Sequence, residues 1–161
     1  LLAGSAVGVA AQDEPSMEAA EVTGRATFVE GLLADPVMSE TPEGIQAGDG
    51  LVTVHTWDTD DPRLDGDVTR TVNFRHIPDT ATIESVTYEL TNDGGSWVGD
   101  GWGYSGPSDA SGFVALSGRG GYEGLSAFIV HEGDVDRGYW DLRGIIFPSD
   151  TPEIPEPYTA E

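Results

Sequence analysis

Residues 82–104 read TIESVTYELTNDGGSWVGDGWGY, and this stretch decides the class of fold. Its two halves, 82–91 and 96–104, alternate apolar residues with polar or small ones, which is the period of a β-strand with one buried face. Between them stands Asn-Asp-Gly-Gly, whose glycines readily adopt the positive φ angles that tight hairpin turns require. The stretch therefore predicts two antiparallel strands joined by a short turn.

The same pattern continues in both directions along the chain. Val, Thr, Ile, Tyr, Phe and Trp collect in short runs, which are separated by Gly, Asp, Pro and Ser. With the pair above, these runs predict eight strands, at 21–30, 51–57, 67–75, 82–91, 96–104, 112–117, 122–131 and 138–147. Because most of the links are short, neighbouring strands are expected to be antiparallel.

Glycines inside the predicted strands bear on how the sheet closes. Eight meandering strands can form either a sandwich or a barrel. Gly24, Gly99 and Gly101 lie in strand interiors, and they favour the barrel because a strongly curved sheet needs bends and close backbone approach. Closure also removes both free edges. We therefore expect an all-β fold, namely a single antiparallel eight-stranded closed β-barrel of meander topology.

The ends of the 161-residue chain differ from its middle. Residues 1–11 are small, apolar and uncharged, and they end where a cleavage site would lie. They are therefore expected to be the remnant of a secretory signal peptide, with a buried strand or short helix as the alternative. Residues 12–20 would be a linker and 21–147 the barrel domain. The Pro- and Glu-rich residues 148–161 would be a disordered tail. This organisation predicts a secreted protein.

The composition excludes several classes of function. The net charge is −22, all seven basic residues are Arg, and the chain has no Cys. A chain this acidic repels nucleic acid and anionic membrane surfaces, so neither is expected as a partner. The lack of Cys excludes thiol nucleophiles, disulfides and thiolate metal sites. What remains is a soluble acidic domain with much Gly and Pro, and the composition leaves open whether it is an enzyme.

Two glycine-rich segments carry a resemblance to a known group of proteins. Residues 94–101 read GGSWVGDG and residues 118–125 read GRGGYEGL. This pattern, G-x-W-x-G followed by G-x-G-x-Y-x-G, resembles small secreted bacterial β-barrels of the allene oxide cyclase and dirigent superfamily, which is calycin-like. The resemblance implies a barrel that holds a hydrophobic guest in its mouth or lumen, with isomerisation or guided radical coupling there. It assigns no catalytic residue in this chain.

Arginines and aromatic residues inside the predicted strands are the candidate ligand-binding residues. Arg70 shares its strand face with Val68 and Val72, and Arg143 shares its face with Ile145. On a lumen face each arginine would pair with a carboxylate and could act in ligand binding or proton transfer. On the outer wall each would form a cross-strand ion pair instead. The candidates for lining a ligand cavity are Trp57, Tyr88, Trp97, Trp102, Arg70 and Arg143.

A metal site is the other candidate. Residues 58–67 read DTDDPRLDGD, with five carboxylates in ten residues. Ca²⁺ prefers several oxygen ligands from one flexible loop, whereas such charge clusters can equally form a solvated turn. The candidate calcium ligands are Asp58, Asp60, Asp61 and Asp65. No other cofactor is expected, because the spacing of the three histidines, His55, His76 and His131, indicates no zinc site.

The long link at residues 31–50 contains five large apolar residues, and loops of this length often form lids. We expect it either to cover one barrel mouth or to lie on the outer wall. The sequence as a whole leads to the expectation of a secreted acidic β-barrel that binds a small apolar molecule in its lumen, with or without isomerase-type activity. The alternative is a non-catalytic extracellular structural or interaction module with a packed lumen, and a calcium-dependent module is a third hypothesis.

Overall fold

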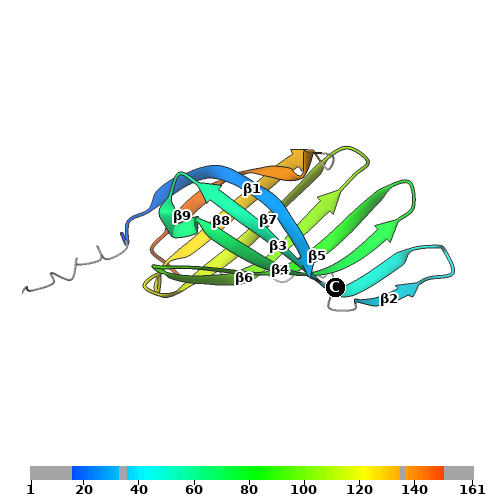
Figure 1. Cartoon of the computed structure of the whole chain (residues 1–161), viewed down its shortest axis with the longest axis horizontal. Helices are drawn as coiled ribbons and strands as arrows, with labels where there is room; N and C mark the ends of the chain where they lie inside the picture. Colours follow the sequence, from blue (N-terminus) through cyan, green and yellow to red (C-terminus); the bar gives the residue numbers. More distant parts are fainter. Residues whose placement is uncertain (1–15, 33–35, 135–136, 151–161) are drawn as a thin grey trace, which may run out of the picture.

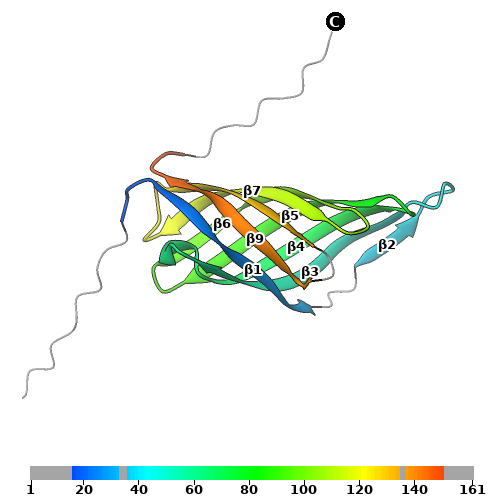
Figure 2. The same ribbon diagram turned by 90° about the horizontal axis from the view of Figure 1, so that it is seen from above.

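The computed structural model describes residues 16–32, 36–134 and 137–150, and it shows a closed antiparallel barrel (Figures 1 and 2). Eight strands form the ring in the order β1-β9-β8-β7-β6-β5-β4-β3, and β1 pairs with β3 to close it. The barrel strands are β1 (Ala20–Leu32), β3 (Gln46–Thr59), β4 (Gly66–Ile77), β5 (Ala81–Asn92), β6 (Gly95–Ser105), β7 (Ala110–Gly120), β8 (Ser126–Asp134) and β9 (Tyr139–Phe147). The predicted fold class is therefore confirmed.

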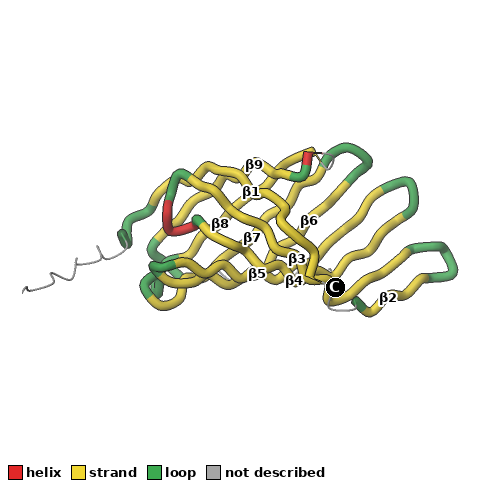
Figure 3. Tube along the Cα trace, viewed as in Figure 1, coloured by secondary structure: helices red, strands yellow, loops and turns green. Residues whose placement is uncertain are grey.

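Two elements stand outside this ring. A short strand, β2 (Val37–Glu40), pairs with the first residues of β3. The 3-10 turn η1 (Pro62–Leu64) connects β3 to β4 and is the red segment at the left of Figure 3. Within the described part of the chain, no helix is long and apolar enough to cross a membrane.

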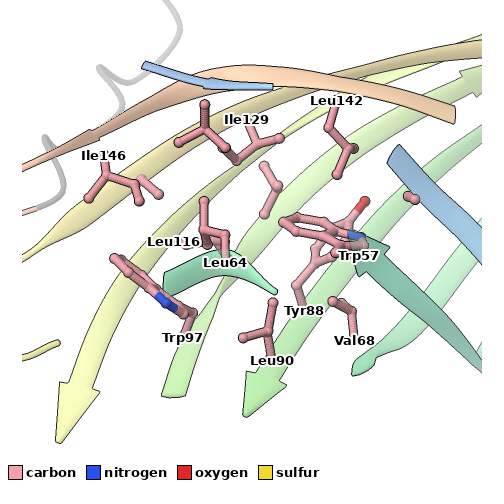
Figure 4. Packing of buried hydrophobic residues seen from close by; sticks show 14 of the residues in the cluster. Trp57, Leu64, Val68, Tyr88, Leu90, Trp97, Leu116, Ile129, Leu142 and Ile146 are labelled. Atoms are coloured by element: carbon pink, nitrogen blue, oxygen red, sulfur yellow. The ribbon is translucent and has the colours of Figure 1, made fainter. Parts of the chain in front are cut away.

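Side chains along each strand point alternately inward and outward, and the inward-facing ones fill most of the lumen. Figure 4 shows large side chains from different strands meeting there, among them Trp57, Tyr88, Leu116 and Ile129. Strand β6 contributes glycines to the same face. A Cβ at Gly101 would overlap the carbonyl oxygen of Phe113 and stand 3.0 Å from the Tyr88 ring. Glycine is therefore required here by close packing, as the predicted barrel curvature implied.

One end of the barrel is closed by η1. Leu64 is completely buried in the core, and the Trp97 indole nitrogen donates to the carbonyl oxygen of Arg63 at 2.7 Å. The Asn92 side-chain amide, in the β5–β6 turn, donates to the carbonyl oxygens of Pro62, Arg63 and Asp65 at 3.3, 3.2 and 2.9 Å. These bonds hold η1 against the barrel end as a plug.

The plug also binds the chain that precedes β1. The Arg63 guanidinium donates to the carbonyl oxygens of Ser16 and Glu18 at 2.6 and 3.0 Å. Part of the predicted linker, 12–20, is thus attached to the barrel end. The predicted signal remnant and most of the predicted tail lie outside the described residues.

The segment after Leu32 differs from both expectations for it. Residues 37–40 and 46–49 pair as an antiparallel ribbon that continues β3 beyond the ring (Figure 1). Val37 and Met38 are 72% and 56% exposed, and the described residues of 31–50 line no part of the lumen cavity. Its described residues, 36–50, form neither a lid nor a loop packed on the outer wall, because residues 37–40 pair with β3 and satisfy their backbone there.

One predicted strand starts later than expected. The prediction placed a strand at 122–131, whereas β8 begins at Ser126. Residues 121–124 form turns after the end of β7 instead, and the Leu125 amide donates to the Tyr122 carbonyl oxygen at 3.0 Å. The Tyr122 ring stacks on Trp97 with a centroid separation of 5.2 Å, and its hydroxyl donates to the Asn92 side-chain oxygen at 2.7 Å. Tyr122 is therefore part of the closed end.

Candidate functional site

The half of the lumen away from η1 contains a small cavity. Its volume is about 50 Å³. Its walls combine titratable side chains with aromatic and small residues: Ala26, His55, Trp57, Arg70, Glu84, Tyr88, Gly103, Tyr104, Ser105, Ala110, Ser111, His131 and Trp140. The residues come from β1 and β3 to β9, including the β6 and β7 ends that face away from the plug. The cavity therefore lies at the open end of the barrel.

Arg70 is the charged residue at the centre of this site. Its Nη2 lies 3.0 Å from Oε2 of Glu84, and the two side chains are only 12% and 23% exposed. Its Nη1 donates to Nε2 of His55 at 3.1 Å, and its guanidinium lies 5.4 Å from the centroid of the Tyr88 ring. Burying two charges costs desolvation free energy, and removal of either partner would leave the other as an uncompensated buried charge.

Both histidines of the site are held neutral. Burial, together with the positive charges of Arg70 and any charge on His131, lowers the pKa of His55 to about 3. Burial and Arg70 likewise lower the pKa of His131 to about 4. Because an arginine can only donate, Nε2 of His55 accepts, and the neutral ring carries its proton on Nδ1. Neutral imidazoles can exchange hydrogen bonds with a ligand without adding charge.

Tyr88 links the two sides of the lumen. Its hydroxyl oxygen lies 3.3 Å from Nε2 of His131. Tyr88 is on β5 and His131 is on β8, and these two strands are not neighbours in the ring. Burial raises its pKa above the ordinary value for tyrosine. The phenol is therefore protonated at neutral pH and can donate a hydrogen bond.

Aromatic rings form the apolar part of the wall. The His55 ring lies 5.1 Å from Trp140 and 5.6 Å from Phe28, between centroids. Trp57 lies 6.3 Å from Tyr88. These rings give a small molecule a surface for apolar contact next to the polar cluster. The arrangement, a few convergent polar groups in an aromatic wall, is typical of ligand sites.

The structure brings together only part of the predicted ligand-binding set. Trp57, Tyr88 and Arg70 line the cavity. Trp97 is fully buried, but it packs in the closed half of the lumen and bonds to the plug.

Trp102 and Arg143 do not line the cavity, because both face outward. Trp102 is 55% exposed, and the Arg143 side chain is 67% exposed and forms an ion pair with Glu132 at 3.0 Å. Strand alternation explains the outward position of Trp102, since Trp97 and Trp102 differ by an odd number of positions and must face opposite sides. Arg143 fits the outer-wall alternative for the strand charges, whereas Arg70 fits the lumen alternative.

Several residues that line the cavity stood outside the predicted ligand-binding set, among them His55, Glu84, His131 and Trp140. The signal was present for Glu84, which shares its strand face with Val86 and Tyr88. His131 likewise follows Ile129 on the inward face of β8. What the sequence does not show is that β5 and β8 face each other across the lumen.

The predicted calcium ligands do not converge. Asp60 accepts hydrogen bonds from the Thr23 amide and hydroxyl, both at 2.8 Å, and Asp65 accepts from the Thr59 amide at 2.6 Å. Within the described ranges, no group of three or more His, Asp or Glu side chains could hold a metal ion. The calcium site remains a prediction of the sequence, without a converging set of ligands among these residues.

Asp61, another of the predicted calcium ligands, forms an ion pair with Arg63, with 2.6 Å between Oδ2 of Asp61 and Nη2 of Arg63. The hydrogen bond from Arg63 lowers the pKa of the Asp61 carboxyl below its ordinary value. The fourth candidate, Asp58, lies on β3 opposite Arg25 of β1 and is exposed. The role that the structure shows for Asp61 is to anchor the plug through Arg63.

Comparison with models of known protein families gives no match to this chain, and comparison with curated protein sequences gives none either. The observed architecture is compatible with a calycin-like barrel, because its eight antiparallel strands follow one another around a closed ring. A function for the chain must therefore be argued from the geometry of the site.

Proposed function

We propose that this barrel binds a small, largely apolar molecule and takes the polar end of that molecule into the lumen cavity. The observation that carries the proposal is the buried Arg70–Glu84 pair in the cavity wall. A barrel that needed only a stable core could fill this half of its lumen with apolar side chains, as it does in the closed half. Burying an ion pair beside two neutral histidines sacrifices stability and is common at functional sites.

The size of the cavity defines how much of the molecule it can take. Sites that enclose a drug-sized ligand measure roughly 300–1,000 Å³, whereas this cavity measures about 50 Å³. Only a head group of a few atoms fits inside. The apolar body would lie at the mouth, where the Phe28 ring contacts the His55 ring and is 45% exposed.

The resemblance to allene oxide cyclase and dirigent barrels supports the same proposal, since it implies a hydrophobic guest in the mouth or lumen. It would add an isomerase-type reaction on that guest, for which no residue of this chain is assigned. The apolar leader-like residues 1–11 add the inference that binding takes place outside the cell.

A second candidate function is an extracellular structural or interaction module with a packed lumen. The small cavity volume favours it, together with the plug that fills the other half of the lumen. This candidate predicts that no small molecule binds saturably.

A fluorescence titration separates the two candidates. The neutral apolar probe N-phenyl-1-naphthylamine should bind one to one and quench tryptophan emission, because Trp57 and Trp140 line the cavity. Absence of saturable binding at any probe concentration that remains soluble would leave the structural module as the function.

Two matched glycine variants locate the probe. A Cβ at Gly103 would stand 3.4 Å from Oε2 of Glu84, an ordinary contact, so the Cβ of Gly103→Val displaces no backbone, and we expect its two methyl groups to occupy the cavity. A Cβ at Gly31 meets nothing within 4 Å, and Gly31 lies outside the cavity wall. Gly103→Val should abolish probe binding at an unchanged melting temperature, whereas Gly31→Val should bind like the wild type. Equal binding by both variants would place the probe elsewhere.

A further inference from the structure

Two buried polar atoms in this half of the barrel lack a hydrogen-bond partner among the described residues. They are Nε of Arg70 and Oγ1 of Thr53. The two residues are direct cross-strand partners, Thr53 on β3 and Arg70 on β4. Partners in an antiparallel pair project to the same face with Cβ atoms about 5 Å apart. The two unsatisfied groups therefore project from neighbouring strands to the same inward face, and Arg70 is one of the residues that line the cavity, whereas Thr53 lies beside it and outside that lining.

Such a pair is unusual, since more than about nine in ten buried polar groups in proteins are hydrogen-bonded. The Nε–H of Arg70 can only donate, and the Thr53 hydroxyl can donate or accept. A single oxygen that accepts from both would satisfy the two groups at once. A ligand group that satisfies both atoms must therefore be a hydrogen-bond acceptor.

The charge of the surroundings decides which acceptor is suitable. The Arg70 guanidinium is already paired with the Glu84 carboxylate, and it also donates a hydrogen bond to the neutral ring of His55. A carboxylate ligand would place a second negative charge beside Glu84, inside a protein of net charge −22. Two carboxylates close together in a poorly solvated site repel each other strongly. A neutral oxygen meets no such repulsion.

We propose that the cavity selects a neutral carbonyl group, as in a ketone, aldehyde or ester, whose oxygen accepts hydrogen bonds from Nε of Arg70 and from the Thr53 hydroxyl. This inference rests on the proposed function and names the chemical class of its ligand. Arg70 lines the cavity, and Thr53 supplies its hydroxyl from the adjacent strand. The ligand is therefore an apolar carbonyl compound rather than a fatty acid or a plain hydrocarbon.

Three molecules of equal chain length test this selectivity, namely 2-octanone, octanoate and octane. Each is measured at pH 7 by its ability to displace N-phenyl-1-naphthylamine from the wild-type protein. We expect 2-octanone to bind at least about tenfold more tightly than either of the others, because unpaired buried donors favour a matching acceptor by one or more hydrogen bonds.

An isotope-edited infrared measurement reports the hydrogen bonds directly. The carbonyl stretch of 2-octanone labelled with ¹³C at the carbonyl carbon should move to lower wavenumber on binding. Thr53→Val removes the hydroxyl at nearly constant shape and should reverse part of that shift while weakening 2-octanone about fivefold. Octane binding should not change. Thr69→Val is the matched control, since Thr69 is exposed on the outer face of β4.

The outcomes separate this inference from the proposed function. If the probe and octane bind but octanoate binds as well as 2-octanone, the carbonyl inference is wrong and the binding function stands. If Thr53→Val and Thr69→Val behave alike toward 2-octanone, the assigned acceptor site is also wrong. If no molecule, the probe included, binds saturably, both the inference and the proposed function fail.

Discussion

Trp97 and Arg63 are joined by a hydrogen bond of 2.7 Å from the indole N–H to the backbone carbonyl oxygen. The Trp97 side chain belongs to the barrel wall, and the carbonyl belongs to the plug that closes the end. The bond therefore fixes the plug from inside the lumen, where no water competes for either group. The plug in turn provides the closed base above which the cavity lies.

Trp97→Phe should lower the free energy of unfolding by about 2 kcal/mol, because it removes this bond and leaves space in the core. Urea denaturation followed by far-ultraviolet circular dichroism measures the change. Trp102→Phe is the control, since Trp102 is 55% exposed and should change stability by less than about 0.5 kcal/mol. Equal effects of the two substitutions would mean that the plug contributes little to stability.

Two ion pairs of equal length should differ in strength. Arg70–Glu84 and Arg143–Glu132 both have a nitrogen–oxygen distance of 3.0 Å, but their side chains are 12%/23% and 67%/57% exposed. Double-mutant cycles with Met for Arg and Gln for Glu should give a coupling of about 2 kcal/mol for the lumen pair. The outer pair should give less than about 1 kcal/mol. The prediction fails if the outer pair couples as strongly as the lumen pair.

Gly101→Ala should destabilise the barrel by about 2 kcal/mol, because the added Cβ would overlap the Phe113 carbonyl oxygen and press on the Tyr88 ring. Gly31→Ala should be neutral or slightly stabilising, since its Cβ meets nothing within 4 Å. Thermal unfolding of the two variants beside the wild type measures both effects. A neutral Gly101→Ala would show that β6 can move away from β5 and β7 without loss.

Stability should fall as the pH decreases from about 6.5 toward 4. The pKa values of His55 and His131 are lowered to about 3 and about 4 in the folded protein. In this range the unfolded chain binds protons on these histidines and the folded chain does not, so acid favours unfolding. Each histidine contributes a slope of up to about 1.4 kcal/mol per pH unit. NMR titration should show both imidazoles still neutral at pH 5.5; a midpoint near 6.5 for either ring would contradict this.

The strand pattern was predictable because alternation is local. Residues 67–75 were expected to form a strand, and β4 (Gly66–Ile77) contains them. Strand β2 was missed because it is only four residues long and all four are exposed. Its stability comes from pairing with β3, and no amphipathic pattern in residues 37–40 reports that pairing.

The site was predictable only in part, for a different reason. The inward position of Arg70 could be inferred from its phase with Val68 and Val72, yet the choice between lumen and outer wall needed the register of the whole ring. The contact between Tyr88 and His131 joins strands β5 and β8. No local rule brings these two residues together, since barrel closure alone sets which strands face each other.

Barrel closure through β1 has a consequence for how the protein is made. Strand β1 pairs with β3 along one edge and with β9 along the other, so that Ala20 lies opposite Ile146. During synthesis β1 can join β3 early, but its second edge has no partner until β9 has left the ribosome. Until then the nascent chain is an open sheet with an unpaired edge, exposed to pairing with other chains. Barrels with such non-local closure fold slowly, so a chain truncated before β9 should aggregate rather than form a smaller barrel.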